Sequence, residues 1–167
     1  MKELPSVRAS FLELFYLAAQ DIGSPVQGLL QSVGLPLQLP EEKELLLLEV
    51  NCWKFVHKVA KKEGCSIFGL VSGETKPWPE IITIQPLFKD CLNLYELLKR
   101  LIIFAPTQSL TSRSSLIEED EYIWFVSPSP RLLPEKESIQ IELFEILGMM
   151  QLVQACAGKT GGQKKFI

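Results

Sequence analysis

The chain has 167 residues, of which 47% are hydrophobic and 22% are charged, and 17 lysines and arginines against 20 aspartates and glutamates give a formal net charge of −3. This length suits one domain with a substantial hydrophobic core, and the composition excludes an intrinsically disordered or collagen-like chain. The excess of acidic residues argues against a stand-alone nucleic-acid-binding protein, which would carry a basic face.

The first part of the chain predicts a series of helices. Apolar residues recur at three- and four-residue steps over residues 7–22, and a second, shorter helix is expected over residues 24–33. The apolar run of residues 45–50 has no decisive periodicity, and we expect it to be helical and to continue into the next element. That element, residues 51–63, has an apolar stripe opposite a row of lysines and is predicted to be an amphipathic helix.

The middle of the chain predicts one short and one long helix. A short helical turn is expected at residues 67–71, followed by a loop. Residues 81–88 fit either a strand or a helix, although Pro86 argues against a central strand. Leucines at helical spacing predict a helix over residues 92–104, which Pro106 is expected to end.

The last third changes from a helical to a strand-like pattern and back. Residues 110–117 and 122–127 alternate or are β-branched and aromatic, which predicts a β-hairpin with a four-residue loop at 118–121. Ser138 is expected to cap a final helix over residues 139–157, which is apolar nearly all round and so should be buried or pack on a partner. The predicted fold class is α+β, predominantly helical, with a small antiparallel sheet in the second half.

Cysteine usage and hydropathy indicate a cytoplasmic protein without membrane association. The cysteines follow no C-x-x-C spacing and do not predict a zinc site, so we expect free thiols in a reducing compartment. They are Cys52, Cys65, Cys91 and Cys156. The opening residues do not form a secretory signal. The uncharged stretch of 13 residues at 146–158 is shorter than the roughly 20 needed to span a bilayer.

No motif in the sequence predicts catalysis, a cofactor or a metal. The run at 158–160 reads Gly-Lys-Thr like the end of a phosphate-binding loop, but Val153 occupies the place of the required first glycine and the run closes a predicted helix. His57 is the only histidine and has no carboxylate at helical spacing, so no nucleophile–base pair can be assembled. We therefore expect that the protein is not an enzyme.

Aromatic residues from five predicted elements are candidates for lining an apolar small-molecule pocket, together with the single histidine. The candidate pocket residues are Trp53, His57, Phe68, Phe104, Trp124 and Phe144. The alternative is that the large rings simply fill the core, as they do in most globular proteins.

A pattern of spaced apolar residues and glycines extends over most of residues 6–158. It comprises Asp21-Ile22-Gly23, Leu29-Leu30, Val33-Gly34-Leu35, the run Asn51-Cys52-Trp53-Lys54-Phe55-Val56 with Ala60 and Glu63-Gly64, then Phe68-Gly69-Leu70, Gly73, the leucines of 92–101, Trp124-Phe125 and Glu142-Leu143. This pattern resembles the N-terminal regulatory domain of one branch of the AraC/XylS-type transcriptional regulators, often called the arabinose-binding domain.

The resemblance implies that residues 1–158 sense a small-molecule effector. Residues 159–167 are basic and rich in glycine, and we expect them to be a linker or a truncated end. The signal would pass to a C-terminal region with two helix-turn-helix units, which this chain does not contain and through which alone it would bind DNA. We expect the effector to enter between the helical part and the hairpin and to change the packing of the last helix, which would also suit a homodimer interface. The alternative is a ligand-free dimerisation or protein-interaction module with a solid interior.

Overall fold

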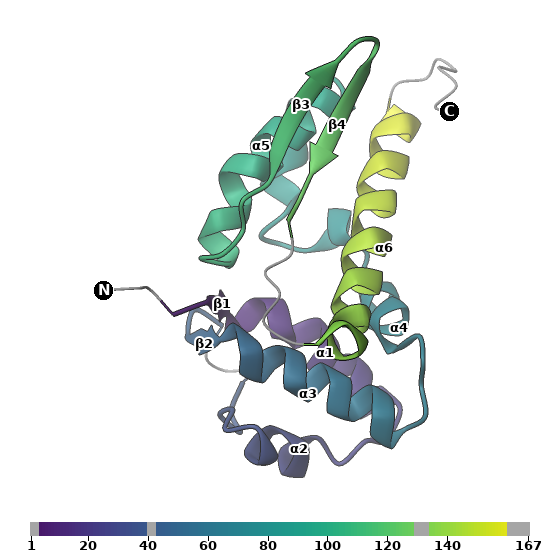
Figure 1. The fold of residues 1–167 in the computed structure, drawn as a ribbon. Coiled ribbons are helices and arrows are strands. Elements are labelled where there is room, and N and C mark those ends of the chain that lie inside the picture. Colours follow the sequence, from purple (N-terminus) through teal and green to yellow (C-terminus); the bar gives the residue numbers. More distant parts are fainter. Residues whose placement is uncertain (1–3, 40–42, 129–133, 160–167) are drawn as a thin grey trace.

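The computed structural model describes residues 4–39, 43–128 and 134–159, in which helices alternate with two small sheets (Figure 1). In chain order the elements are β1 (Ser6–Arg8), α1 (Ala9–Asp21), α2 (Val26–Ser32), β2 (Leu46–Leu48), α3 (Glu49–Lys62), α4 (Phe68–Thr75), the short 3₁₀ helices η1 (Trp78–Glu80) and η2 (Gln85–Phe88), α5 (Leu94–Gln108), β3 (Ser115–Glu119), β4 (Tyr122–Val126) and α6 (Glu135–Lys159). The mostly helical α+β class is confirmed, with an antiparallel hairpin in the second half.

The molecule has two parts that share one long helix. In Figure 1, α1, α2 and α3 form a helical body, while α5 and the β3–β4 hairpin lie above it; α6 begins at the body and extends alongside the hairpin. Apolar faces of α1, α3, α4 and α6 meet in the core. The largest fully buried side chains of these helices include Leu12, Phe15, Phe55, Val56, Val59, Phe68, Phe144 and Leu152.

The prediction of a helix over residues 45–50 is wrong for residues 46–48, although Glu49 and Val50 do belong to the next helix, α3. Residues 46–48 form β2, which pairs antiparallel with β1 so that Val7 lies opposite Leu47. Both of these side chains are buried, while Leu46 and Leu48 on either side are exposed. The run is too short for periodicity to separate strand from helix, and a partner forty residues away decides the outcome. The same pairing delays the start of α1 to Ala9.

Three helices are longer than predicted. The predicted turn at 67–71 extends to Thr75 as α4. The last helix begins before Ser138, at Glu135, and continues to Lys159. Pro106 lies inside α5 rather than ending it, since the helix continues to Gln108. A proline this close to a C-terminus removes only one backbone hydrogen bond, and the amide of the C-cap residue still donates to the carbonyl of residue 105 at 3.0 Å.

The hairpin is present, but its turn is tighter than predicted. Glu119 pairs directly with Tyr122, which leaves a two-residue turn in place of the expected four-residue loop. Asp120 takes a left-handed backbone conformation with φ +52°, a conformation that aspartate tolerates better than most residues. The hairpin is held against α5 by Tyr95, whose hydroxyl donates to Glu118 at 3.2 Å.

Glycines and glutamines fix one face of α6 against α4 and η1. A Cβ on Gly69 would be 1.9 Å from the backbone oxygen of Gln140, so α4 and α6 are in direct backbone contact there. The side chain of Gln140 accepts from the amide of Gly69 at 2.8 Å and donates to the carbonyl of Ser66 at 2.9 Å. One face of α6 therefore packs in the core.

The apolar part of α6 is longer than the uncharged stretch at 146–158 indicates. The stretch Lys136–Ala157 is long and apolar enough to cross a bilayer by length and composition, and among the described residues it is the one such stretch. A third of the apolar 18-residue window within this stretch is buried inside the fold, and core helices of soluble proteins can be equally long and apolar.

Candidate functional site

The structure brings three of the six predicted pocket residues into one packed aromatic cluster. The ring of Phe144 lies 4.5 Å from that of Phe15, which in turn lies 6.3 Å from Phe68. Phe11 joins the cluster to α3, with ring centroids 5.7 Å from Trp53 and 5.5 Å from Phe144. These rings fill the core by direct contact, as the alternative interpretation of the aromatic residues expected.

The other three predicted pocket residues lie outside this cluster. Phe104 is partly buried on α5 and packs on the edge of the core, and His57 is partly buried on α3. Trp124 is 54% exposed on β4, where its nearest ring is Tyr122 at 6.4 Å. None of the six residues lines either of the two hollows described below. Ligand binding by these residues stays a prediction.

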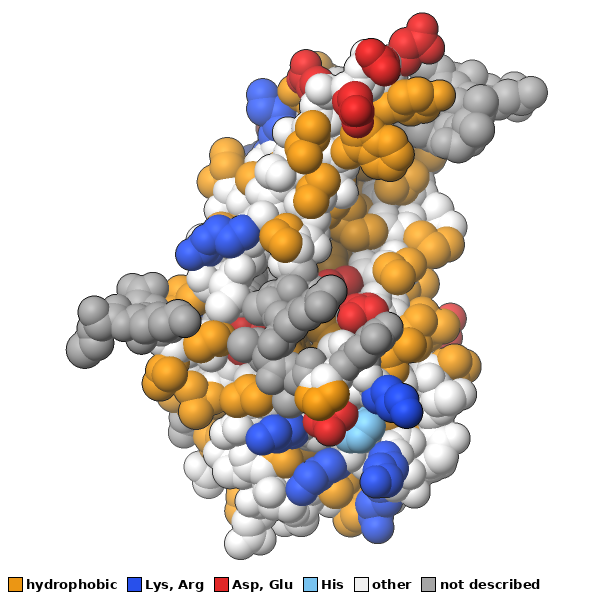
Figure 2. Space-filling model, in the orientation of Figure 1, with side chains coloured by type: hydrophobic (Ala, Val, Ile, Leu, Met, Phe, Trp, Pro, Cys, Tyr) orange, Lys and Arg blue, Asp and Glu red, His pale blue; other side chains and the backbone are white. Residues whose placement is uncertain are grey.

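The larger hollow is a groove of about 650 Å³ between the end of the hairpin and α6. Figure 2 shows the surface hollowed here, with hydrophobic side chains on both sides and acidic ones at its lower end. Its lining residues are Phe125, Ser127, Glu142, Glu145, Ile146, Met149, Met150, Val153 and Gln154. Both the volume and the mostly apolar lining are typical of small-molecule sites.

Two apolar stripes on α6 explain how the sequence forms this groove. Residues such as Ile141, Phe144 and Leu152 are buried in the core. A second stripe at three- and four-residue steps, with Met149 and Val153 at its centre, faces the groove instead. A helix that appears apolar nearly all round is therefore a helix with two apolar partners. This second stripe is the feature of the sequence that could have indicated the groove. The candidate pocket residues, which were chosen among the aromatic side chains, do not include it.

Glu145 lies in the wall of this groove in an unfavourable electrostatic setting. Burial, and then the nearby carboxylates of Glu49 and Glu142, raises the pKa of Glu145 to about 7. Among the described residues, no side chain or backbone group donates a hydrogen bond to the Glu145 carboxylate. A half-buried carboxylate without a donor is the group that gains most from an added cation or donor.

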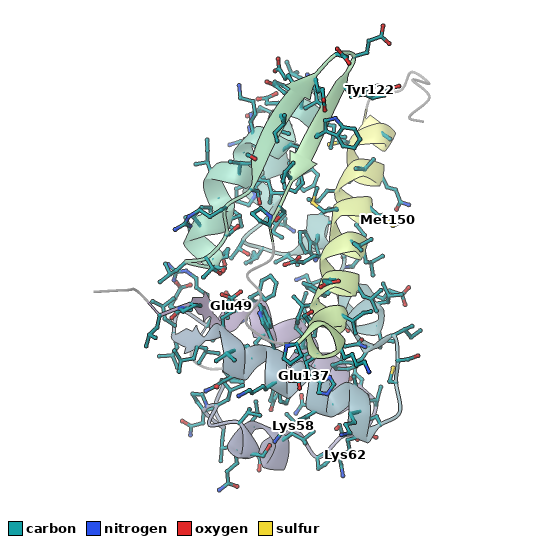
Figure 3. All side chains as sticks on the ribbon, in the orientation of Figure 1. Glu49, Lys58, Lys62, Tyr122, Glu137 and Met150 are labelled. Atoms are coloured by element: carbon teal, nitrogen blue, oxygen red, sulfur yellow. The ribbon has the colours of Figure 1, made fainter. Side chains whose placement is uncertain are left out.

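The two neighbouring carboxylates differ from Glu145 because each has a hydrogen-bond donor. Glu49, at the start of α3 between the two parts of the molecule (Figure 3), accepts from the hydroxyl of Thr111 at 2.6 Å. Burial raises the pKa of Glu49, while hydrogen bonds from Thr111 and Trp53 lower it. Glu142 accepts from Ser138 at 3.1 Å. Of the three carboxylates, Glu145 is therefore the one that a positively charged ligand would stabilise most.

A second, smaller hollow of about 460 Å³ lies at the α1–α2 turn. Its lining is Tyr16, Gln20 and residues 23–28. None of these described lining residues is acidic or basic.

Metal binding and thiol chemistry find little support in the described part of the chain. No group of three or more histidine, cysteine, aspartate or glutamate side chains is arranged there to hold a metal ion. No disulfide links the four cysteines, all of which lie in described segments. Burial, and then the charge of Glu49, raises the pKa of the Cys52 thiol to about 12, which suppresses the reactive thiolate.

No family model and no curated protein sequence matches this chain. The resemblance to AraC/XylS-type regulatory domains therefore stays a prediction.

Proposed function

We propose that this chain is the ligand-sensing domain of an AraC/XylS-type transcriptional regulator and that its effector binds in the groove between the hairpin and α6. The observation that carries the proposal is the groove itself, an apolar hollow of about 650 Å³ whose wall holds a partly buried carboxylate that receives no hydrogen bond from the described part of the chain. Such a combination of apolar surface with few polar groups is typical of small-molecule sites. In this proposal the protein is cytoplasmic and contacts DNA only through a further region.

The groove is well placed to transmit a signal, because α6 contacts both the core and the ligand site. The close contacts at Gly69 and Gly148 restrict the positions that α6 can take on α4 and η1. A ligand that prefers one arrangement of the hairpin relative to α6 shifts the population toward that arrangement. The end of α6 at Lys159 leads toward the proposed DNA-binding region.

A thermal-shift screen of small metabolites, read together with tryptophan fluorescence, tests the sensing function. A groove ligand raises the melting temperature by mass action, and V153W, which fills the groove, abolishes that rise. Q27W, which places the same ring at the second hollow, is the matched control and keeps the response. A screen without any stabilising ligand, or a ligand response that survives V153W, contradicts the proposal.

The reading frame beyond codon 167 tests the regulator class separately. Two helix-turn-helix units are expected there. A stop codon or an unrelated domain contradicts the assignment to this class, while leaving the groove as a small-molecule site to be judged by the screen.

An exposed apolar face on the hairpin favours a second candidate function, dimerisation or protein interaction. Alternation and the strand register place Ile117, Tyr122, Trp124 and Val126 on one face, and they are 49%, 67%, 54% and 37% exposed. Contiguous exposed apolar surface marks interaction sites. Sedimentation analysis should show a homodimer that W124S weakens. A monomer at all concentrations contradicts this function.

A further inference from the structure

The charge of the groove narrows the class of ligand, an inference that rests on the proposed function. Among the described residues that line it, Glu142 and Glu145 are the ionisable ones, and both are acidic; none of these described residues is a lysine, arginine or histidine. We propose that the groove binds small apolar amines, with the ammonium group paired to Glu145 and the hydrocarbon part lying against Met149, Met150 and Phe125.

Glu145 provides the polar end of the proposed site. It faces Glu142 on its own helix and Glu49 on α3, and the hairpin residues that line the groove, Phe125 and Ser127, carry no charge. A ligand ammonium supplies the donor and the positive charge that the described residues do not give this carboxylate. An anionic ligand would instead add a fourth negative charge beside Glu49, Glu142 and Glu145.

The rest of the groove wall suits the hydrocarbon part of such a ligand. Ile146, Val153 and the two methionines give an apolar surface, and methionine side chains adapt to irregular ligand shapes. The ring of Phe125 adds an aromatic surface, to which organic cations are attracted. A bare metal ion would not use these features, and the described carboxylates do not form a metal-binding group.

Three ligands with the same ring and different end groups test the proposal by isothermal titration at pH 8: 2-phenylethylamine, 2-phenylethanol and 3-phenylpropanoate. The amine should bind about tenfold more tightly than the alcohol, the effect of one charge-assisted hydrogen bond in a partly open site, and the carboxylate most weakly. E145Q should bring the amine and the alcohol to equal affinity. E137Q, which removes an acid at the start of α6 outside the groove (Figure 3), is the matched control and keeps the difference.

The results of these titrations distinguish a failure of the amine assignment from a failure of the proposed sensing function. Equal affinity of amine and alcohol for the wild-type protein, or an amine preference that survives E145Q, overturns the inference and leaves the groove as a site for neutral ligands. If none of the three binds at millimolar concentration, the amine assignment is overturned. The proposed sensing function fails as well only if the metabolite screen also finds no groove ligand.

Discussion

Trp78 lies so close to Gly148 that a Cβ at residue 148 would be 2.0 Å from Cε2 of the indole ring. The same ring lies 5.6 Å from Phe144, and the backbone amide of Trp78 donates to Gln151 at 2.9 Å. This contact packs η1 against the core face of α6, so the position of α6 depends on the absence of a side chain at residue 148. The opposite side of the helix forms the wall of the groove.

Replacing Gly148 by alanine should destabilise the fold, because the ring of Trp78 must move out of a packed position. We expect a loss of about 1–3 kcal/mol in the free energy of unfolding, measured by urea denaturation followed by circular dichroism. Gly28 provides the control: it lies in α2 with open space around its Cβ direction. G28A should therefore be neutral or stabilising by up to about 1 kcal/mol. Equal effects of the two substitutions would contradict the packing described here.

Gln140 should contribute more to stability than an exposed glutamine. Q140A leaves the buried amide of Gly69 without its acceptor, which costs about 1–3 kcal/mol in the free energy of unfolding. Q27A, at an exposed position of α2, should change it by less than about 0.5 kcal/mol. Chemical denaturation of both variants measures the difference, and a Q140A protein as stable as the wild type would show that the contact between α4 and α6 does not need this side chain.

Glu145 should make the fold less stable as the pH rises. Its pKa is about 7 in the folded protein against an ordinary value of 4.5, so the folded state holds a proton that the unfolded state releases between these two values. The free energy of unfolding therefore falls between pH 4.5 and 7, by at most about 3 kcal/mol. E145Q should remove this pH dependence of the free energy of unfolding and should be more stable than the wild type at pH 8. Urea denaturation at a series of pH values from 4.5 to 8 measures the free energy of unfolding of both proteins.

E137Q is the control for the pH experiment, since it removes a carboxylate from the same helix away from the groove. Its free energy of unfolding should depend on pH as that of the wild type does. A wild-type slope that E145Q does not change would place the responsible group elsewhere, with Glu49 the next candidate because burial raises its pKa as well.

The cysteines should differ in their reactivity toward a thiol reagent. Cys52 is fully buried with a pKa near 12, whereas Cys65 and Cys91 are partly exposed. Brief treatment of the native protein with iodoacetamide should therefore modify Cys65 and Cys91 and spare Cys52, as peptide mass spectrometry can show. Modification of Cys52 as fast as Cys65 in the native protein, at a rate unaffected by urea, would mean that the core around α3 is open.

The helices could be predicted from the sequence because their signals are local. In α5, for example, the Asn93 side chain caps the amide of Glu96, and apolar residues recur at helical spacing behind it. The β1–β2 sheet could not be predicted, since the pairing of Val7 with Leu47 depends on segments forty residues apart. The tight turn of the hairpin depends on the left-handed conformation of Asp120, a choice that aspartate permits but does not require.

The site was harder to predict than the fold. Effector entry between the helical part and the hairpin stays a prediction; the groove lies between the end of the hairpin and α6. The large aromatic rings selected from the sequence as pocket candidates are mostly core residues. A ring such as that of Phe144 has the same hydropathy in a core as in a pocket, so composition does not separate the two. The groove is lined by aliphatic residues, methionines and Glu145, whose shared position emerges only once α6 is seen to have two apolar sides.

Methyl NMR of methionine-labelled protein tests ligand binding in the groove most directly. Met149 and Met150 both line the groove, and M150L assigns their two methyl signals. Titration with 2-phenylethylamine is predicted to shift the Met149 and Met150 resonances along one saturating curve. Saturable binding by calorimetry with both groove signals unmoved would contradict the account.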